Sequence, residues 1–209
     1  MENKPKVFQL NKFPMDFGRL LLMVLIPVFR VKKIYLCDRQ EIKNLGAALI
    51  AANHTGMTDP FILNASFWYR RFFYTASEEI MTGFRGKLLK GAGCIRIDRT
   101  SADYEAIKKC VSILKEGYLL GIFPQGHIGG EGLKGGVVLM SARAGVPIVP
   151  THIERRAHWW QRHRVVFGQP IRISDVTDKK LPGVKETQAV IELMEERYEE
   201  CRNGIIRES

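Results

Sequence analysis

The sequence predicts an α/β protein with a largely parallel sheet flanked by helices, and with an additional apolar helix near its N-terminus. Strand-like segments alternate with segments of helical periodicity over most of the chain, which is typical of parallel sheets. Hydrophobic residues make up 45% of the 209 residues and charged residues 26%, values that exclude wholesale disorder. A chain of this length buries roughly 70% of its unfolded surface, which is enough for one domain with a sizeable core.

An apolar run of ten residues, 20–29, stands near the N-terminus. About 20 apolar residues are needed to cross a bilayer as a helix, so no transmembrane helix is predicted. Three basic residues follow within positions 30–33, and a short apolar helix with such a basic rim can lie in a membrane interface. The alternative is a helix in the core of the domain. We expect an N-terminal membrane-interface segment over residues 1–33 and one domain over residues 34–209.

The domain is expected to alternate strands and helices. The predicted strands cover residues 47–52, 72–76, 94–98, 118–123, 147–153 and 165–167. The predicted helices cover residues 59–69, 79–90, 101–116, 135–144 and 186–201. Pro60 suits the first turn of the first of these helices. The third has apolar residues at helical spacing, with Thr100 or Ser101 as its cap and Gly117 at its end.

Thirty-two basic residues against 22 acidic ones give a formal net charge of +10. Such a charge favours an anionic partner, and the candidates are nucleic acid, an acidic membrane and a phosphorylated small molecule. The four cysteines stand far apart and form no C-x-x-C pair. The sequence therefore predicts neither a disulfide framework nor a zinc ribbon, and it favours a reducing compartment.

The first candidate site is the stretch over residues 53–60 (NHTGMTDP), between a predicted strand and a predicted helix. Ligands in α/β folds usually bind where strands end. His54 and Asp59 are the pair that makes a general base, because a carboxylate fixes the tautomer of an imidazole and stabilises the imidazolium. A turn must then fold Asp59 back onto His54. Alternatively, Asp59 caps its helix and His54 packs at the strand end; no further ligand stands nearby for a metal.

Three further segments carry weaker signals. Arg96 and Arg99 stand near the end of a predicted strand, where an arginine can hold a phosphate or form a surface pair with the intervening aspartate. The loop around Gly126 is rich in glycine, so its N–H groups can cradle an anion, although an ordinary turn has the same composition. Lys134 precedes a helix of small residues, where an anionic ligand is also favoured.

In order and spacing these segments resemble the motifs of the glycerolipid acyltransferase family, that of the lysophosphatidate acyltransferases. Asn53, His54 and Asp59 match the family motif N-H-x4-D. Residues 93–99 match G-x-I-x-I-D-R, and residues 146–150 match V-P-I-V-P. Unrelated chains would not carry this ordered set, so the sequence is identified as a member of that family.

The resemblance implies an O-acyltransferase that moves a fatty acyl group to the free hydroxyl of a lysophospholipid, with lysophosphatidate as the usual acceptor and phosphatidate as the product. It implies that His54 deprotonates this hydroxyl and that Asp59 orients His54. Acyl-CoA or acyl-carrier protein is the implied donor, with no other cofactor and no metal. Both lipids reside in membranes, so we expect a peripheral or monotopic protein on an anionic membrane surface at the cytoplasmic face.

The third family motif, F-P-E-G-T-R-S, is matched only in part, because Gln125, His127 and Ile128 replace its Glu, Thr and Arg. Loss of the arginine removes a bidentate phosphate contact. The resemblance implies that Arg99 contacts the acceptor phosphate, and that the Gly126 loop, beside Gln125, helps to bind the acceptor or polarises the reacting carbonyl. The candidates to replace the lost contact are Arg96, His127 and Lys134. A different lysolipid or an amino-acid-based lipid is therefore an alternative acceptor.

Two interpretations from other classes stand beside this one. The altered third motif suggests a catalytically idle lipid- or CoA-binding protein, although binding alone does not require His54 and Asp59. The net charge suggests a nucleic-acid-binding module, with Trp159 and Trp160 among arginines as a stacking platform. These tryptophans equally suit a membrane interface, and no recognised nucleic-acid motif occurs, so no nucleic-acid partner is expected.

Overall fold

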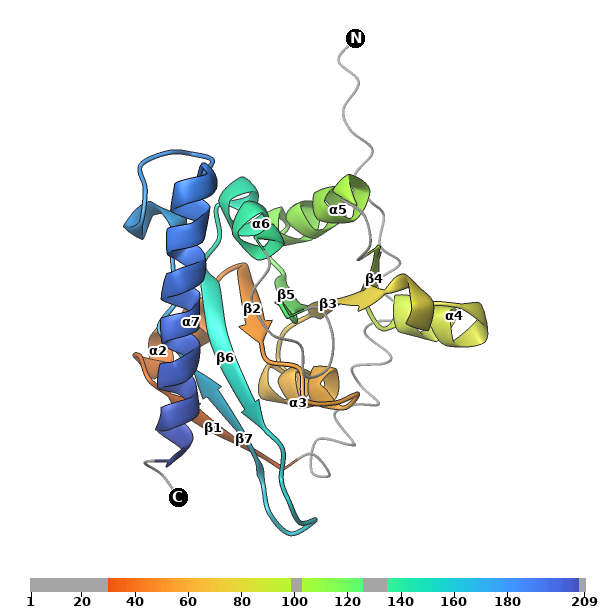
Figure 1. The fold of residues 1–209 in the computed structure, drawn as a ribbon. Coiled ribbons are helices and arrows are strands. Elements are labelled where there is room, and N and C mark those ends of the chain that lie inside the picture. The colour runs from red at the N-terminus through yellow and green to blue at the C-terminus, as the bar shows by residue number, and fades with distance from the viewer. Residues whose placement is uncertain (1–29, 99–102, 126–134, 207–209) are drawn as a thin grey trace.

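The computed structural model describes residues 30–98, 103–125 and 135–206 (Figure 1). Within these residues seven strands form one sheet in the spatial order β1-β7-β6-β2-β5-β3-β4. The strands are β1 (Val31–Tyr35), β2 (Ala48–Ala52), β3 (Phe72–Ser77), β4 (Cys94–Ile97), β5 (Leu119–Ile122), β6 (Ile148–Glu154) and β7 (His163–Phe167). The α-helices are α2 (Arg39–Asn44), α3 (Asp59–Ser66), α4 (Gly83–Gly91), α5 (Tyr104–Lys115), α6 (Gly136–Ala144) and α7 (Val184–Ile206). The short 3₁₀ helices are η1 (Glu78–Ile80) and η2 (Ile173–Asp175).

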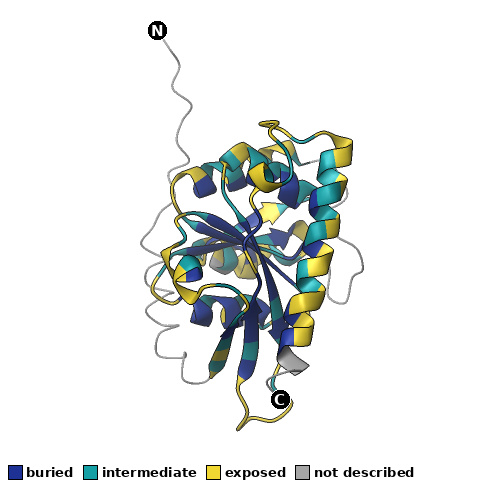
Figure 2. Ribbon diagram, turned by 90° about the vertical axis from the view of Figure 1, so that its left-hand side faces the viewer, coloured by how far each residue is buried: buried dark blue, intermediate teal, exposed yellow. Residues whose placement is uncertain are grey.

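All pairings between these strands are parallel except that of β6 with β7, which form an antiparallel hairpin. Helices α5, α6 and α7 bury side chains against one face of the sheet, around Leu49 of β2. Helices α2 and α3 cover the other face, around Ile50. All of β2 is buried, because alternate side chains of a central strand pack against a helix layer on each face (Figure 2). The predicted α/β fold with a largely parallel sheet flanked by helices is confirmed.

Two elements at the start of the described chain, β1 and α2, are missing from the sequence-based prediction. β1 pairs with β7, so residues 31–33 of the predicted N-terminal segment lie in the sheet. Residues 1–29, which include the expected interfacial helix, lie outside the described residues, and this helix stays a prediction. Among the helices that the structure describes, none combines the length and apolar character that crossing a bilayer requires.

All five predicted helices are present with bounds that differ from the predicted ones, and two of the differences have a clear local cause. The single helix predicted over residues 79–90 is divided into η1 and α4, and Gly83 at the break has a φ of +57°, a left-handed conformation that interrupts a regular helix. Helix α5 begins after Asp103, whose carboxylate accepts a hydrogen bond from the N–H of Ala106. The cap is therefore Asp103, whereas the expected caps lie at positions outside the described residues. Gly117 ends α5 as predicted, with a φ of +91°.

Strands β2 to β6 point in the same direction, so their carboxyl ends meet at one edge of the sheet. This edge carries the turn after β2, Gln125 after β5, η1 after β3 and the turn after β6. Because open α/β sheets bind ligands at this edge, the fold gathers the candidate residues of several motifs in one region.

Candidate active site

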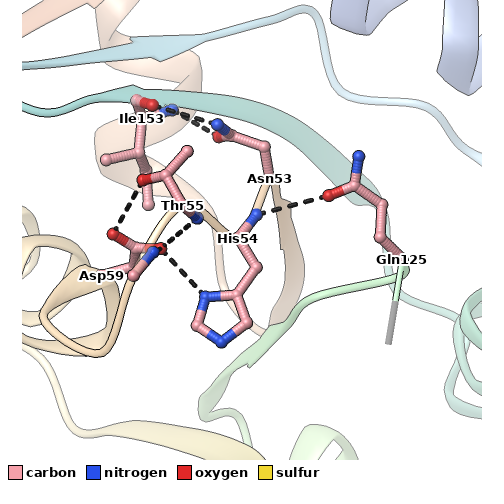
Figure 3. Close-up of polar contacts among 7 residues, drawn as sticks. Asn53, His54, Thr55, Asp59, Gln125 and Ile153 are labelled. Atoms are coloured by element: carbon pink, nitrogen blue, oxygen red, sulfur yellow. Dashed lines mark hydrogen bonds and ion pairs between the residues drawn. The ribbon is translucent and has the colours of Figure 1, made fainter. Parts of the chain in front are cut away.

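The turn after β2 is tied to the neighbouring strand by Asn53. Its side-chain amide donates to the carbonyl oxygen of Ile153 at 3.0 Å and accepts from the N–H of Ile153 at 2.6 Å (Figure 3). A carboxamide offers a donor and an acceptor side by side, which a carboxylate of the same shape does not. Asn53 therefore locks the end of β2 to β6 and fixes where the next residue, His54, begins.

Asp59 is fully buried and closes the turn from the other side. Its Oδ2 accepts hydrogen bonds from the N–H groups of Thr55 and Gly56 at 2.6 and 2.8 Å and lies 2.9 Å from Nδ1 of His54 (Figure 3). Its Oδ1 accepts from the hydroxyl of Thr55 at 3.1 Å. The turn thus folds Asp59 back onto His54, as the proposed general base requires.

The alternative role of Asp59 as a simple helix cap does not fit this geometry. The cap position of α3 belongs to Thr58, and the oxygens of Asp59 bind groups that precede the helix. Pro60 stands in the first turn of α3 as expected, and its carbonyl oxygen accepts a hydrogen bond of 2.7 Å from the hydroxyl of Tyr74 in β3. Tyr74 thereby fixes the start of α3, and with it Asp59, relative to the sheet.

The imidazole of His54 is held in one orientation. Its ring stacks on the ring of Phe123, with centroids 4.2 Å apart and planes inclined by 18°. Because Nδ1 donates its proton to Asp59, the other ring nitrogen, Nε2, is the unprotonated one in the neutral ring. Among the residues that the structure describes, Nε2 has no hydrogen-bond partner, and the side chain keeps 13% of its surface exposed. His54 therefore presents an open basic nitrogen.

The electrostatic state of Asp59 follows from two opposed effects. Burial raises the pKa of its carboxyl group, but the hydrogen bonds from His54, Gly56 and Thr55 outweigh burial, and the pKa lies below its ordinary value. The carboxylate is therefore charged throughout the neutral range. This fixed negative charge beside Nδ1 holds the ring in the tautomer that leaves Nε2 unprotonated.

Gln125 is brought to this pair by β5. Its Oε1 accepts a hydrogen bond of 3.4 Å from the backbone N–H of His54 (Figure 3). The residue predicted from the partly matched motif therefore lies beside the histidine, and it does so without adding charge. Three neighbouring predictions, Gly126, His127 and Lys134, lie outside the described residues.

Arg96 lies in β4, whose carboxyl end belongs to the same edge of the sheet. Its guanidinium forms an ion pair of 2.9 Å with Glu78 of η1, and both side chains are more than half exposed. Arg96 therefore forms a surface ion pair, but its partner is Glu78 and not Asp98, the partner considered from the sequence. Arg99 lies outside the described residues.

One neighbour of the site carries no motif and was missed by the sequence analysis. The guanidinium of Arg155, directly after β6, lies against Gly56, where a Cβ atom would stand 2.4 Å from Nη1. A glycine at position 56 indicates that another group packs closely there, but the sequence does not show which group it is. In the described part of the chain, no three His, Cys, Asp or Glu side chains come together as metal ligands.

A buried carboxylate that orients a histidine with one open nitrogen, at the carboxyl edge of an α/β sheet, is the arrangement of a general-base enzyme. The sequence model of the family described as Acyltransferase matches residues 33–154. The chain belongs to this acyltransferase family and is an O-acyltransferase, as the ordered motifs indicate.

Individual relatives agree with this placement. A 1-acyl-sn-glycerol-3-phosphate acyltransferase of Bacillus subtilis (strain 168) is 25% identical in an alignment of 181 residues that covers 83% of this chain and 89% of that protein. A protein of the same description from Streptococcus pneumoniae is 28% identical in an alignment of 159 residues that covers 73% of this chain and 60% of that protein. The crystal structure of the 1-acyl-sn-glycerophosphate acyltransferase PlsC from Thermotoga maritima has the same fold. It superposes with a TM-score of 0.53 at 15% identity, over 88% of this chain and 78% of that one.

Replacing Asp59 by Asn tests the electrostatic account of the turn. The variant keeps the shape of the side chain but loses charge-assisted hydrogen bonds, so the free energy of unfolding at pH 7 falls by about 2 kcal/mol. Because the pKa of Asp59 is lowered by folding, its contribution is complete above its ordinary value of 3.8 and disappears as the pH falls through the lower folded value. Urea unfolding of both proteins at several pH values measures this. A difference that stays constant or grows below pH 4 contradicts the account.

Proposed function

We propose that the protein transfers a fatty acyl group from acyl-CoA or acyl-carrier protein to the free hydroxyl of lysophosphatidate, forming phosphatidate. The observation that carries this proposal is the open Nε2 of His54, held in place by Asp59 behind it and by Phe123 against the ring. The relatives described as 1-acyl-sn-glycerol-3-phosphate acyltransferases support the choice of acceptor.

In the proposed reaction, Nε2 of His54 takes the proton of the acceptor hydroxyl while the hydroxyl oxygen attacks the carbonyl carbon of the acyl thioester. The carboxylate of Asp59 stabilises the imidazolium that forms. The tetrahedral intermediate then expels the thiolate, which receives the proton from His54 and leaves as a free thiol. The histidine returns to its starting state and the acyl group forms an ester with the acceptor. This route requires no covalent acyl-enzyme.

The acceptor phosphate requires cations near the dyad. Arg96 supplies one if it exchanges Glu78 for the phosphate, and an exposed ion pair costs little to separate. Arg155 is a second candidate, because its guanidinium lies against the turn that holds His54. The predicted roles of Arg99, His127, Lys134 and the Gly126 loop in acceptor binding stay part of this proposal.

A second acceptor class follows from two residues. Gln125 is neutral where the family motif has glutamate, and Ile128 stands where it has arginine. These replacements leave the dyad intact and change the surroundings of the acceptor. They favour a different lysolipid, or an amino-acid-based lipid, as the alternative acceptor. For either acceptor we expect action at the cytoplasmic face of a membrane, with the part of the N-terminal segment that precedes β1 in the interface.

The release of free thiol on addition of lysophosphatidate tests the proposed reaction, with acyl-CoA and acyl-carrier protein supplied separately. Loss of the general base in His54→Ala lowers kcat by about 10²- to 10⁴-fold. Gly46→Ala serves as the control and keeps full activity, because its new methyl group meets nothing within 4 Å. Equal turnover by His54→Ala and the wild type contradicts the mechanism. Wild-type turnover with another lysolipid alone supports the second acceptor class, and no turnover with any acceptor supports the idle-binder interpretation.

The role of Arg96 has a test of its own in the pair Arg96→Ala and Glu78→Gln. A hydrogen bond to a charged group contributes about 1.5–3 kcal/mol, so Arg96→Ala raises KM for lysophosphatidate roughly 10- to 100-fold and leaves kcat nearly unchanged. Glu78→Gln removes the competing carboxylate and lowers KM by about two- to fivefold. If KM is the same in both variants and the wild type, the phosphate binds elsewhere.

A further inference from the structure

The turn between β6 and β7, residues 155–162, exposes two tryptophans. Trp159 is 76% exposed and Trp160 is 55% exposed, although indole is among the side chains that gain most from burial. The turn projects past the carboxyl edge of the sheet, beyond the helices that cover both faces (Figures 1 and 2). Two adjacent exposed indoles at a protruding tip are the kind of apolar surface that marks an interaction site.

The indoles are held in this position by the polar groups around them. The side-chain Oε1 of Gln161 accepts hydrogen bonds from the N–H groups of Ala157 and His158, at 3.0 and 3.1 Å. The guanidinium of Arg156 donates to the carbonyl oxygen of Trp159 at 3.0 Å. Arg30 in turn donates to the carbonyl oxygen of Trp160 at 2.9 Å. Side chains of the protein thus bind four backbone groups of the tip, and this turn presents its indoles outward.

The same tip carries an excess of positive charge. Residues 154–164 contain four arginines and one glutamate, and this glutamate, Glu154, is paired with Arg164. Arginine beside exposed tryptophan is the combination that suits the interface of an anionic membrane. Indole rings lie at the level of the lipid headgroups, and guanidinium groups are attracted to lipid phosphates.

The tip also adjoins the catalytic dyad. Arg155 at its base lies against Gly56, between His54 and Asp59 in the turn after β2. The next residue of that turn, Met57, is 52% exposed. A membrane that contacts the β6–β7 turn therefore lies next to the site, on the edge of the sheet where the open nitrogen of His54 is found.

We infer that the β6–β7 turn is a membrane-docking element that inserts Trp159 and Trp160 into the interface of an anionic bilayer and so brings the dyad to lipid substrates. The proposal rests on the proposed function in taking a membrane-resident acceptor as the reason for docking. A nucleic-acid platform fits less well, because stacked bases need open ring faces. Trp160 already stacks on His158, with centroids 4.5 Å apart and planes inclined by 1°, and Trp159 meets Trp160 edge-on at 5.9 Å.

The chain contains three tryptophans, which makes a direct test possible. In Trp68→Phe only the two indoles of the tip emit fluorescence. In the matched variant Trp159→Phe/Trp160→Phe only Trp68 emits. Trp68 lies at the opposite edge of the sheet, because the nearby Arg70 binds the segments that precede β2 and β5. Both variants keep the N-terminal segment, so vesicle binding through that segment alone affects them equally.

With vesicles of phosphatidylglycerol and phosphatidylcholine, we expect a blue shift and quenching by brominated acyl chains in Trp68→Phe, but not in Trp159→Phe/Trp160→Phe. Arg162→Gln weakens partitioning onto these vesicles about fivefold, the effect of one basic residue near an anionic surface. Vesicle-bound Trp68→Phe with unchanged emission overturns the proposal. Emission of Trp68→Phe that changes only on addition of a single-stranded oligonucleotide also overturns it. So does emission that is already blue-shifted without vesicles and depends on protein concentration, because this behaviour indicates that the tip binds a second copy of the chain.

An activity measurement separates failure of this proposal from failure of the proposed function. Trp159→Ser/Trp160→Ser loses turnover of lysophosphatidate presented in anionic vesicles but retains turnover of the same lipid dispersed in detergent. His54→Ala loses both. Equal wild-type and double-variant rates on vesicles overturn the docking role while leaving the acyltransferase reaction intact.

Discussion

The buried carboxylate of Asp59 gathers the N–H groups of Thr55 and Gly56, the hydroxyl of Thr55 and Nδ1 of His54 around one charge. A buried charge is tolerated only when it is well hydrogen-bonded, so the turn after β2 has to close around it. Closing the turn is also what orients the histidine. The hydrogen bonds to Asp59 therefore both close the turn and prepare His54 as a base, so a change to Asp59 affects the local fold and the base together.

The rest of the structure supplies the surroundings that this charge requires. Asn53 fastens one side of the turn to β6, Tyr74 fixes the start of α3, and Phe123 holds the plane of the imidazole. These three anchors come from β3 and from the segments that follow β2 and β5, strands whose carboxyl ends share one edge of the sheet. Cations and exposed indoles stand at that same edge, at Arg96, Arg155 and the β6–β7 turn. The arrangement places the chemistry, the anionic acceptor and a lipid surface within one region.

Much of this could be predicted from the sequence, because short apolar runs and an ordered set of motifs fix the strands and the dyad by local pattern. The residues alone left two alternatives for Asp59, a partner of His54 or a helix cap, and the resemblance to the family motif favoured the first. The pairing of Arg96 with Glu78 could not be predicted, because those residues meet only after β3 and β4 align. The contact of Arg155 with Gly56 likewise depends on β2 and β6 lying side by side. β1 was missed because two adjacent lysines, Lys32 and Lys33, interrupt its apolar pattern and because its partner, β7, lies far along the chain.

The protonation state of His54 tests the central claim most directly. Nitrogen-15 NMR of the side chains distinguishes the two imidazole tautomers, and a His54→Gln variant identifies the signals among the five histidines. The account predicts that neutral His54 carries its proton on Nδ1 and leaves Nε2 unprotonated, and that Asp59→Asn weakens this preference. A wild-type histidine with its proton on Nε2 would contradict the account, because such a ring faces the acceptor hydroxyl with no base to receive its proton.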